Sequence, residues 1–286
     1  MAHAYLLADV FTDRAFGGNQ LAVLPDAEGL GEAQMQAIAR EFNLSETTFV
    51  TRGSAPGRFR VRIFTPGAEL PFAGHPIVGT AIVLQHLGRA AGECIFELKV
   101  GPVRVELGQG TATFFRDGAP EVRAPGVAAA ELAAMIGAPA LAGPAFEAGY
   151  GTAFLFLPLP DRAAVAAARL RLDLWRAAEA RLWGHGAYVF AVPGERDGVS
   201  QVHARLFAPD LGIGEDPATG SAAAGLVGCL PGPADGMHRV AITQGVEMGR
   251  PSLIHATATR AGGTVRAISI GGGAVVVGEG RLLRLP

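Results

Sequence analysis

The segment ELPFAGHPIVG, residues 69–79, returns later in the chain as EDPATGSAAAG, residues 215–225. The two segments align without gaps, and the Glu, the Pro and both glycines coincide. Each copy has the pattern of a strand, a glycine-rich turn and a helix. In the first copy, Pro76 suits the first helical turn, because the N–H that proline lacks would be unpaired there anyway.

Two further matches extend the repeat toward the N-terminus. RIFTP at 62–66 matches RLFAP at 205–209, and GNQLAVLP at 18–25 resembles GTAFLFLP at 151–158. One such match in a chain rich in glycine and alanine has little weight, but three in the same order indicate a duplication. The pattern resets around residues 118–125, so we expect two similar halves, residues 1–124 and 125–286. Equivalent loops of a pseudo-twofold pair should then face each other at the domain interface, a favoured place for a ligand pocket.

Length and composition agree with two globular domains. At 286 residues the chain exceeds the size at which one hydrophobic core usually keeps growing. Hydrophobic residues make up 49% of the chain and charged residues 17%, which argues against disorder. The formal net charge of -2 offers no basic surface for nucleic acid or an anionic membrane.

The sequence indicates neither a metal site nor a membrane segment. Cys94 and Cys229 are too few for a disulfide scaffold or a cysteine-rich zinc site, and no HExxH spacing occurs. The N-terminal MAHAYLLADVF lacks a positive leader and is typical of a first strand. No apolar run approaches the roughly 20 residues that a membrane helix needs. We therefore expect a cytoplasmic protein.

Periodicity predicts alternating strands and helices. Apolar residues recur every three or four positions in residues 32–42, as in an amphipathic helix. In residues 58–64 apolar side chains alternate with arginines, so one face of that strand should be buried. The helix that follows Gly220 should be shorter than the one that follows Gly74, because Pro231 and Pro233 come soon after it. Further helices are expected at 76–87, 128–136, 162–168, 174–182 and 222–230, and strands at 4–10, 20–24, 47–51, 95–98, 103–107, 111–115, 153–157, 188–192, 202–207 and within 239–285.

The two glycine turns carry polar side chains of different kinds. His75 follows Gly74 at one helix start, and Ser221 follows Gly220 at the other, just after Asp216. A helix start offers unpaired N–H groups and the positive end of the macrodipole, which suit a carboxylate or a developing enolate oxygen. Each residue also has a purely structural interpretation, since Asp and Ser cap helices and glycine allows a tight turn. Different polar groups at both starts favour a binding site whose halves have diverged.

Glu46 lies in NLSETTFV, residues 43–50, between a predicted helix and a predicted strand. By spacing alone it is a surface acid. Nothing in the local pattern singles it out for chemistry.

The chain resembles the PhzF-like isomerases of phenazine biosynthesis, which have the diaminopimelate epimerase fold. The segments that carry the resemblance are FGGNQLAV (16–23), NLSETTFV (43–50), FTP with ELPFAGHP (64–76), EDPATGSA (215–222), QG (244–245) and MGRPS (248–252). The resemblance implies an α+β fold of two pseudo-symmetric domains, each a barrel-like, mostly antiparallel sheet around a central helix. The helices after Gly74 and Gly220 would be the central ones, and family members are usually homodimers.

The resemblance also implies the roles of single residues. In that family a glutamate moves the proton without metal or organic cofactor, and it corresponds to Glu46. The supporting His, Asp and Ser correspond to His75, Asp216 and Ser221. A small molecule is the implied partner, with neither nucleic acid nor membrane.

Amino-acid epimerases of the same fold use two cysteines as opposed acid and base. Those positions correspond to Ala73 and Thr219, and neither side chain titrates. The correspondence therefore excludes two-cysteine epimerisation. Cys94 and Cys229 lie outside the turns and are interpreted as packing residues.

The expected reaction moves a proton and a double bond on a small, cyclic, carboxylate-bearing substrate, as in the isomerisation of dihydro-hydroxyanthranilate. Glu46 would act as base and then as acid, with a pKa raised by a partly dry pocket. His75 and Asp216 would bind amine or hydroxyl groups, and the two helix starts would hold the carboxylate. Two alternatives stay open: a lyase or dehydratase acting on a small hydroxy or amino acid, and a non-catalytic small-ligand-binding protein of the same fold.

Overall fold

The chain folds into two compact units, and the computed structural model describes residues 3–286. The first unit runs to Arg116 and also contains Gly271–Pro286, and the second unit is Asp117–Ile270. The predicted halves come from the sequence repeat, whereas each unit groups the residues that contact one another in space. The two divisions differ most at the C-terminus, where strand β17 (Thr264–Leu282) starts in the second unit and ends in the first.

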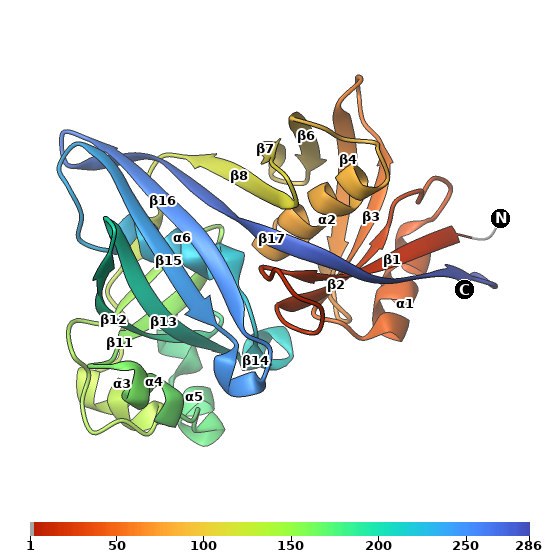
Figure 1. Ribbon diagram of the computed structural model, residues 1–286. Coiled ribbons are helices and arrows are strands. Elements are labelled where there is room, and N and C mark those ends of the chain that lie inside the picture. Colours follow the sequence, from red (N-terminus) through yellow and green to blue (C-terminus); the bar gives the residue numbers. More distant parts are fainter. Residues whose placement is uncertain (1–2) are drawn as a thin grey trace. The chain divides into compact units, whose positions relative to one another are not determined.

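The sheet of the first unit closes on itself into a barrel of eight strands (Figure 1). The pairs β2–β3 and β4–β6 are parallel, and the pairs β1–β2, β3–β4, β6–β7, β7–β8 and β1–β17 are antiparallel. Strand β17 pairs with both β8 and β1 and so completes the ring. The other strands of the ring are β1 (His3–Val10), β2 (Asn19–Leu24), β3 (Glu46–Arg52), β4 (Arg58–Phe64), β6 (Glu93–Leu98), β7 (Gly101–Leu107) and β8 (Thr111–Asp117), and the short β5 (Glu69–Leu70) pairs with β4.

Helix α2 (Gly74–His86) is the central helix of this barrel. Every residue from Gly74 to Leu84 is buried, as expected for a helix that is apolar on all sides. Gly79 allows its close approach to the sheet, since a Cβ there would lie 2.6 Å from atoms of both Val10 and Leu21. Helix α1 (Glu32–Phe42) instead packs against the sheet with one apolar face, over a cluster that includes Phe49.

The second unit repeats this topology. From β10 to β16 its strands pair antiparallel, parallel, antiparallel, parallel and antiparallel, the same order as from β1 to β7. Gly225 of the central helix α6 (Gly220–Cys229) takes the place of Gly79, and a Cβ there would lie 3.2 Å from the Ala148 carbonyl oxygen. The strands are β9 (Glu121–Arg123), β10 (Phe146–Tyr150), β11 (Thr152–Pro158), β12 (Ala187–Arg196), β13 (Val199–Ala208), β14 (Ile213–Asp216), β15 (Gly236–Gln244) and β16 (Ser252–Ala261).

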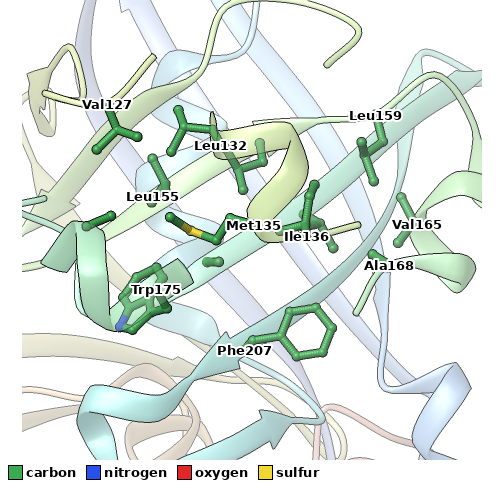
Figure 2. Close-up of a cluster of buried hydrophobic side chains, with 14 of the residues drawn as sticks. Val127, Leu132, Met135, Ile136, Leu155, Leu159, Val165, Ala168, Trp175 and Phe207 are labelled. Atoms are coloured by element: carbon green, nitrogen blue, oxygen red, sulfur yellow. The ribbon is translucent and has the colours of Figure 1, made fainter. Parts of the chain in front are cut away.

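Three helices outside this second sheet cover its apolar outer face: α3 (Ala129–Met135), α4 (Arg162–Ala167) and α5 (Leu172–Ala178). They enclose a buried cluster around Trp175, shown in Figure 2. Short 3-10 turns follow at Glu179–Arg181, Pro209–Leu211 and Val246–Met248. The α+β class, the barrel-like sheets and the central helices confirm the predicted fold.

The two central helices begin earlier than periodicity predicted, at Gly74 and Gly220 themselves. As predicted, the second is shorter, with 10 residues against 13. Strand β10 (Phe146–Tyr150) was not predicted, because Glu147 and Gly149 break its apolar pattern. Glu147 is buried there because its Oε1 accepts hydrogen bonds from the backbone of Trp183 and Gly184 at 2.6 and 2.8 Å.

No helix within residues 3–286 is long and apolar enough to span a membrane. In the same part of the chain, no group of three or more His, Cys, Asp or Glu side chains is arranged to hold a metal ion. Cys94 and Cys229 are free thiols, and burial raises the pKa of Cys94 to about 12 and that of Cys229 to about 11. Thiols that stay protonated are poor nucleophiles, in keeping with a packing role.

Candidate active site

His75 lies at the start of the central helix of the first unit. Its side chain is only 4% exposed. Asn19, the first residue of β2, donates a hydrogen bond from Nδ2 to Nδ1 of His75 over 3.2 Å. With the Asn19 amide nitrogen as donor, Nδ1 is the acceptor, and the proton of a neutral imidazole then lies on Nε2.

The turn before β2 places Asn19. Gly18 has a φ of +62°, and a Cβ at this position would lie 2.3 Å from the carbonyl oxygen of Val10. The backbone N–H of Phe16 donates to Oδ2 of Asp9 over 2.7 Å. The Gly-Gly-Asn motif therefore combines a turn that only glycine fits with the amide that orients His75.

Glu46 reaches the other side of the same imidazole ring. Its Oε2 lies 3.4 Å from Nε2 of His75, and its side chain is 11% exposed. The prediction of a surface acid from spacing was therefore wrong. The reason is that β3 is a strand of the closed sheet, and its alternation puts Glu46 on the same face as Thr48, which hydrogen-bonds Thr80 of the central helix.

The imidazole of His75 is neutral over the ordinary pH range. Burial lowers its pKa to about 3, and a hydrogen bond with the backbone of Gln20 opposes this shift only in part. A neutral ring with its proton on Nε2 can donate toward the Glu46 carboxylate. It brings no positive charge to the site.

This shift predicts a loss of stability in mild acid. The pKa of His75 is near 6.5 in the unfolded chain and about 3 in the folded one, so the unfolded state binds more protons between these values. Stability then falls as pH drops through this window, by roughly 2 kcal/mol from pH 7 to pH 5. Urea unfolding followed by circular dichroism at both pH values measures this loss, and in His75→Gln it should shrink to what other groups cause. An equal loss in the variant would contradict the assignment.

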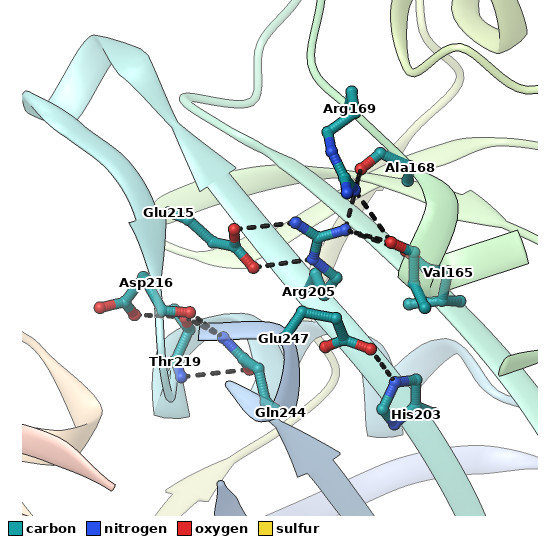
Figure 3. A network of polar contacts seen from close by, with 11 residues as sticks. Val165, Ala168, Arg169, His203, Arg205, Glu215, Asp216, Thr219, Gln244 and Glu247 are labelled. Atoms are coloured by element: carbon teal, nitrogen blue, oxygen red, sulfur yellow. Dashed lines mark hydrogen bonds and ion pairs between the residues drawn. The ribbon is translucent and has the colours of Figure 1, made fainter. Parts of the chain in front are cut away.

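The second turn holds Asp216 in a buried network, shown in Figure 3. The Oγ1 of Thr219 donates to Oδ2 of Asp216. Gln244, at the end of β15, donates from Nε2 to the Asp216 carbonyl oxygen at 2.8 Å and to Thr219 Oγ1 at 3.0 Å. Its Oε1 accepts from the Thr219 N–H and from the Tyr188 hydroxyl, each at 3.3 Å. Burial, and then the charge of Asp216, raise the pKa of Tyr188, so this hydroxyl stays protonated.

Ala73 and Thr219 are the N-cap residues of the two central helices. The epimerases of this fold carry their cysteines at these positions, according to the correspondence drawn above. Here one position has a methyl group, and the hydroxyl of the other is bonded to Asp216. Gly74 and Gly220 are buried first residues of their helices, and Ser221 is half-buried beside Gly220.

Matched ion pairs precede the two turns. Arg62 donates from Nε and Nη2 to Glu69, both at 2.7 Å, and Arg205 donates in the same way to Glu215 at 2.7 and 2.9 Å. Each guanidinium also lies over the ring of the phenylalanine two residues later, at 5.1 and 4.8 Å. Because the repeat aligns both pairs, the duplication includes side-chain contacts as well as the backbone.

The structure brings Glu46, His75 and Gly74 together in the first unit, and Asp216, Gly220 and Ser221 together in the second. That the two groups form one site stays a prediction. Asn19 and Gln244 were not predicted as site residues, although both lie in the motifs quoted above. The available signal was an amide side chain beside glycine, in GGNQ and in QG.

Comparison with known proteins gives matches over nearly the whole chain. Residues 8–280 match the PhzC-PhzF family of phenazine biosynthesis-like proteins. An uncharacterised isomerase of Mesorhizobium japonicum is 41% identical over 301 residues, covering 97% of this chain and 98% of that protein. The trans-2,3-dihydro-3-hydroxyanthranilate isomerase of Pseudomonas chlororaphis is 36% identical over 288 residues, with coverage of 98% and 99%. The solved PhzF-family phenazine biosynthesis protein of Bacillus anthracis shares the fold with a TM-score of 0.89 at 24% identity, covering 99% of this chain and all of that one.

Proposed function

The chain is an isomerase that belongs to the PhzC-PhzF family, and from this premise we propose that Glu46 moves a proton, and with it a double bond, on a small, cyclic, carboxylate-bearing substrate. The observation that carries this proposal is the buried pair of Glu46 and His75, whose facing atoms lie 3.4 Å apart. An acid–base catalyst needs a carboxyl group that is shielded from bulk water and held in one orientation. The neutral imidazole supplies a donor for that purpose.

The reaction divides into two proton transfers. The Glu46 carboxylate takes a proton from a ring carbon, the electron pair of that C–H bond forms a double bond to the neighbouring carbon, and the former π pair moves to the carbon that is protonated next. The protonated carboxyl exchanges its proton with solvent between the two steps and then protonates another carbon of the same conjugated system. No atom is lost and no electron leaves the substrate, so the step needs no oxidant or reductant.

The remaining predicted residues bind the substrate in this proposal. The backbone N–H groups at Gly74 and Gly220 and the hydroxyl of Ser221 hold its carboxylate, since helix starts favour anions. Asp216 accepts a hydrogen bond from an amine or hydroxyl of the substrate, and His75 supports the proton transfer. These contacts would also stabilise the charge that develops as the proton leaves.

Proton exchange in deuterated water tests the proposal. The purified protein is incubated with a panel of small cyclic amino and hydroxy acids that includes trans-2,3-dihydro-3-hydroxyanthranilate. Deuterium uptake without loss of water or ammonia supports isomerisation. Release of either molecule identifies a lyase or dehydratase instead, and no exchange with any compound leaves a non-catalytic binding protein.

We also propose that the protein is a homodimer, as its resemblance to the family implies, and that it is located in the cytoplasm. Light scattering at micromolar concentration gives the mass directly. A particle of about twice the 29.4 kDa chain is expected, and a monomer would contradict the homodimer.

A further inference from the structure

Gln244 is hydrogen-bonded at both ends of its side-chain amide, mainly to the second turn. It is fully buried, at the last position of β15, and its amide makes four hydrogen bonds at 2.8 to 3.3 Å. Two of these go to the backbone of the turn, one to the Thr219 hydroxyl that itself holds Asp216, and one to Tyr188. Both ends of the amide are used, so its orientation is fixed.

The first unit has a position equivalent to that of Gln244, beside a turn that lacks a counterpart of the Asp216 carboxylate. In the repeat Arg62 corresponds to Arg205, and hence Arg60 corresponds to His203. Arg60 pairs with Glu97 and His203 pairs with Thr243 in the same parallel register, which makes Leu98 the counterpart of Gln244. Both residues end their strands.

Two other members of the network, Asp216 and Thr219, have apolar counterparts in the first unit, whereas Tyr188 corresponds to Thr48. The aligned turns match Leu70 with Asp216 and Ala73 with Thr219. The first unit therefore builds the same strand, turn and helix with Leu, Ala and Leu at these positions. The fold therefore does not require Asp216, Thr219 and Gln244 to be polar, so these three side chains have another purpose.

The backbone after Gln244 packs directly on the same turn. Gly245 has a φ of +73°, and a Cβ there would lie 2.6 Å from the carbonyl oxygen of Pro217. The hydroxyl of Ser252 donates to that same oxygen over 2.8 Å. Ser252 thus fixes the turn without touching Asp216 or Thr219, which makes it a matched control.

We propose that Gln244 is a positioning residue for the reaction: through Thr219 and the turn backbone it fixes where the Asp216 carboxylate meets the substrate. This inference rests on the proposed function. It assigns Gln244 no contact with substrate. It also explains why a glutamine is buried in a place where the sister unit has leucine.

Gln244→Leu, which installs the residue of the first unit, tests the geometry without any substrate. The Thr219 N–H should lose its acceptor, so amide exchange in residues 216–221, followed by mass spectrometry, should accelerate by about tenfold or more, in line with the loss of a buried hydrogen bond. Ser252→Ala should leave the Thr219 amide protected. Unchanged protection of this segment in Gln244→Leu would overturn the proposal even if the protein proves to have no catalytic activity.

Gln244→Glu tests the link to catalysis, with trans-2,3-dihydro-3-hydroxyanthranilate or the panel compound that the wild type turns over. A protonated carboxyl can accept as the amide does and can donate one of the two hydrogen bonds that the amide donates, whereas an ionised one cannot donate and repels Asp216. The kcat/KM of this variant should approach that of the wild type at low pH and fall by about 100-fold as pH rises, a loss typical of a misplaced catalytic group. A merely structural role predicts a pH profile of wild-type shape, and that result would refute a positioning role. Inactivity of the wild type itself would count against the proposed function, while the exchange experiment still decides the role of Gln244.

Discussion

Glu46→Gln is expected to lower kcat by about 1,000-fold or more, since positioned acid–base groups contribute about 100- to 10,000-fold and this one acts in both proton transfers. The amide has the same size as the carboxyl and can still accept from His75 Nε2, which lies 3.4 Å from the carboxylate oxygen. It cannot take up a proton, however. The fold should persist, because replacing a buried charge by a neutral group removes a cost of burial.

The measurement is the initial rate of deuterium uptake in the substrate that the wild type turns over, together with a binding isotherm for that compound. Glu41→Gln is the control, because Glu41 is exposed on α1 and its replacement removes the same charge. Binding within a few-fold of the wild type together with lost turnover would separate catalysis from affinity. Full turnover in Glu46→Gln would contradict the assignment of Glu46 as the base.

The fold could be predicted because the repeat preserves local features. Matched glycines such as Gly79 and Gly225 are needed wherever a central helix touches its sheet, and matched Arg–Glu pairs precede each turn. These features are close in sequence, so one chain shows them directly. The pairing order of the strands in the two units, identical from β1 to β7 and from β10 to β16, follows from the same duplication.

The site could be predicted only in part, because its contacts join distant positions. Glu46 and His75 come from a strand and a helix 29 residues apart, and the network of Gln244 reaches back 28 residues to Asp216. The local sequence pattern does not indicate such long-range contacts, so from that pattern alone Glu46 is predicted to be a surface acid. The resemblance named Glu46, but Gln244 became interpretable only through its hydrogen bonds.

The two units have diverged in a complementary way. In the parallel pairs β2–β3 and β11–β12, Ala22 meets Thr47 and Leu155 meets Ala187, so Gly186 is the counterpart of Glu46. A Cβ at Gly186 would lie 2.8 Å from the Phe207 carbonyl oxygen, so the second unit has no room there for an acid. Its acid is Asp216 instead, where the first unit has Leu70. The two units therefore share one topology but carry different functional side chains.

Arg205→Ala is expected to destabilise the second unit by about 3 to 5 kcal/mol, the cost of breaking a buried ion pair by removing one partner. Arg205 is 4% exposed. Besides Glu215, its guanidinium donates from Nη1 to the carbonyl oxygens of Val165, Ala166 and Ala168 at 2.8 to 3.2 Å. These carbonyls lie at the C-terminal end of α4, where Val165 also accepts from the Ala168 N–H, and Ala166 and Ala168 also accept from Arg169 Nη1. The truncation removes one donor from each of these carbonyls and, at the same time, both hydrogen bonds to the Glu215 carboxylate.

The matched control for this variant is Arg62→Ala at the equivalent position of the first unit. The Arg62 side chain is 26% exposed and bonds the carboxylates of Glu69 and the exposed Glu32 but no helix carbonyl oxygen, while Lys99 also contacts its partner Glu69. Its removal should cost only about 1 kcal/mol, as for a solvated pair.

Trp175 and Trp183, the two tryptophans of the chain, both lie in the second unit. Tryptophan fluorescence in a urea titration therefore reports on the unfolding of that unit, and circular dichroism reports on both units. Arg205→Lys, which keeps the charge but not the planar fork, should fall between the wild type and the alanine variant. Equal losses for the alanine variants at 62 and 205 would show that the contacts with α4 contribute nothing.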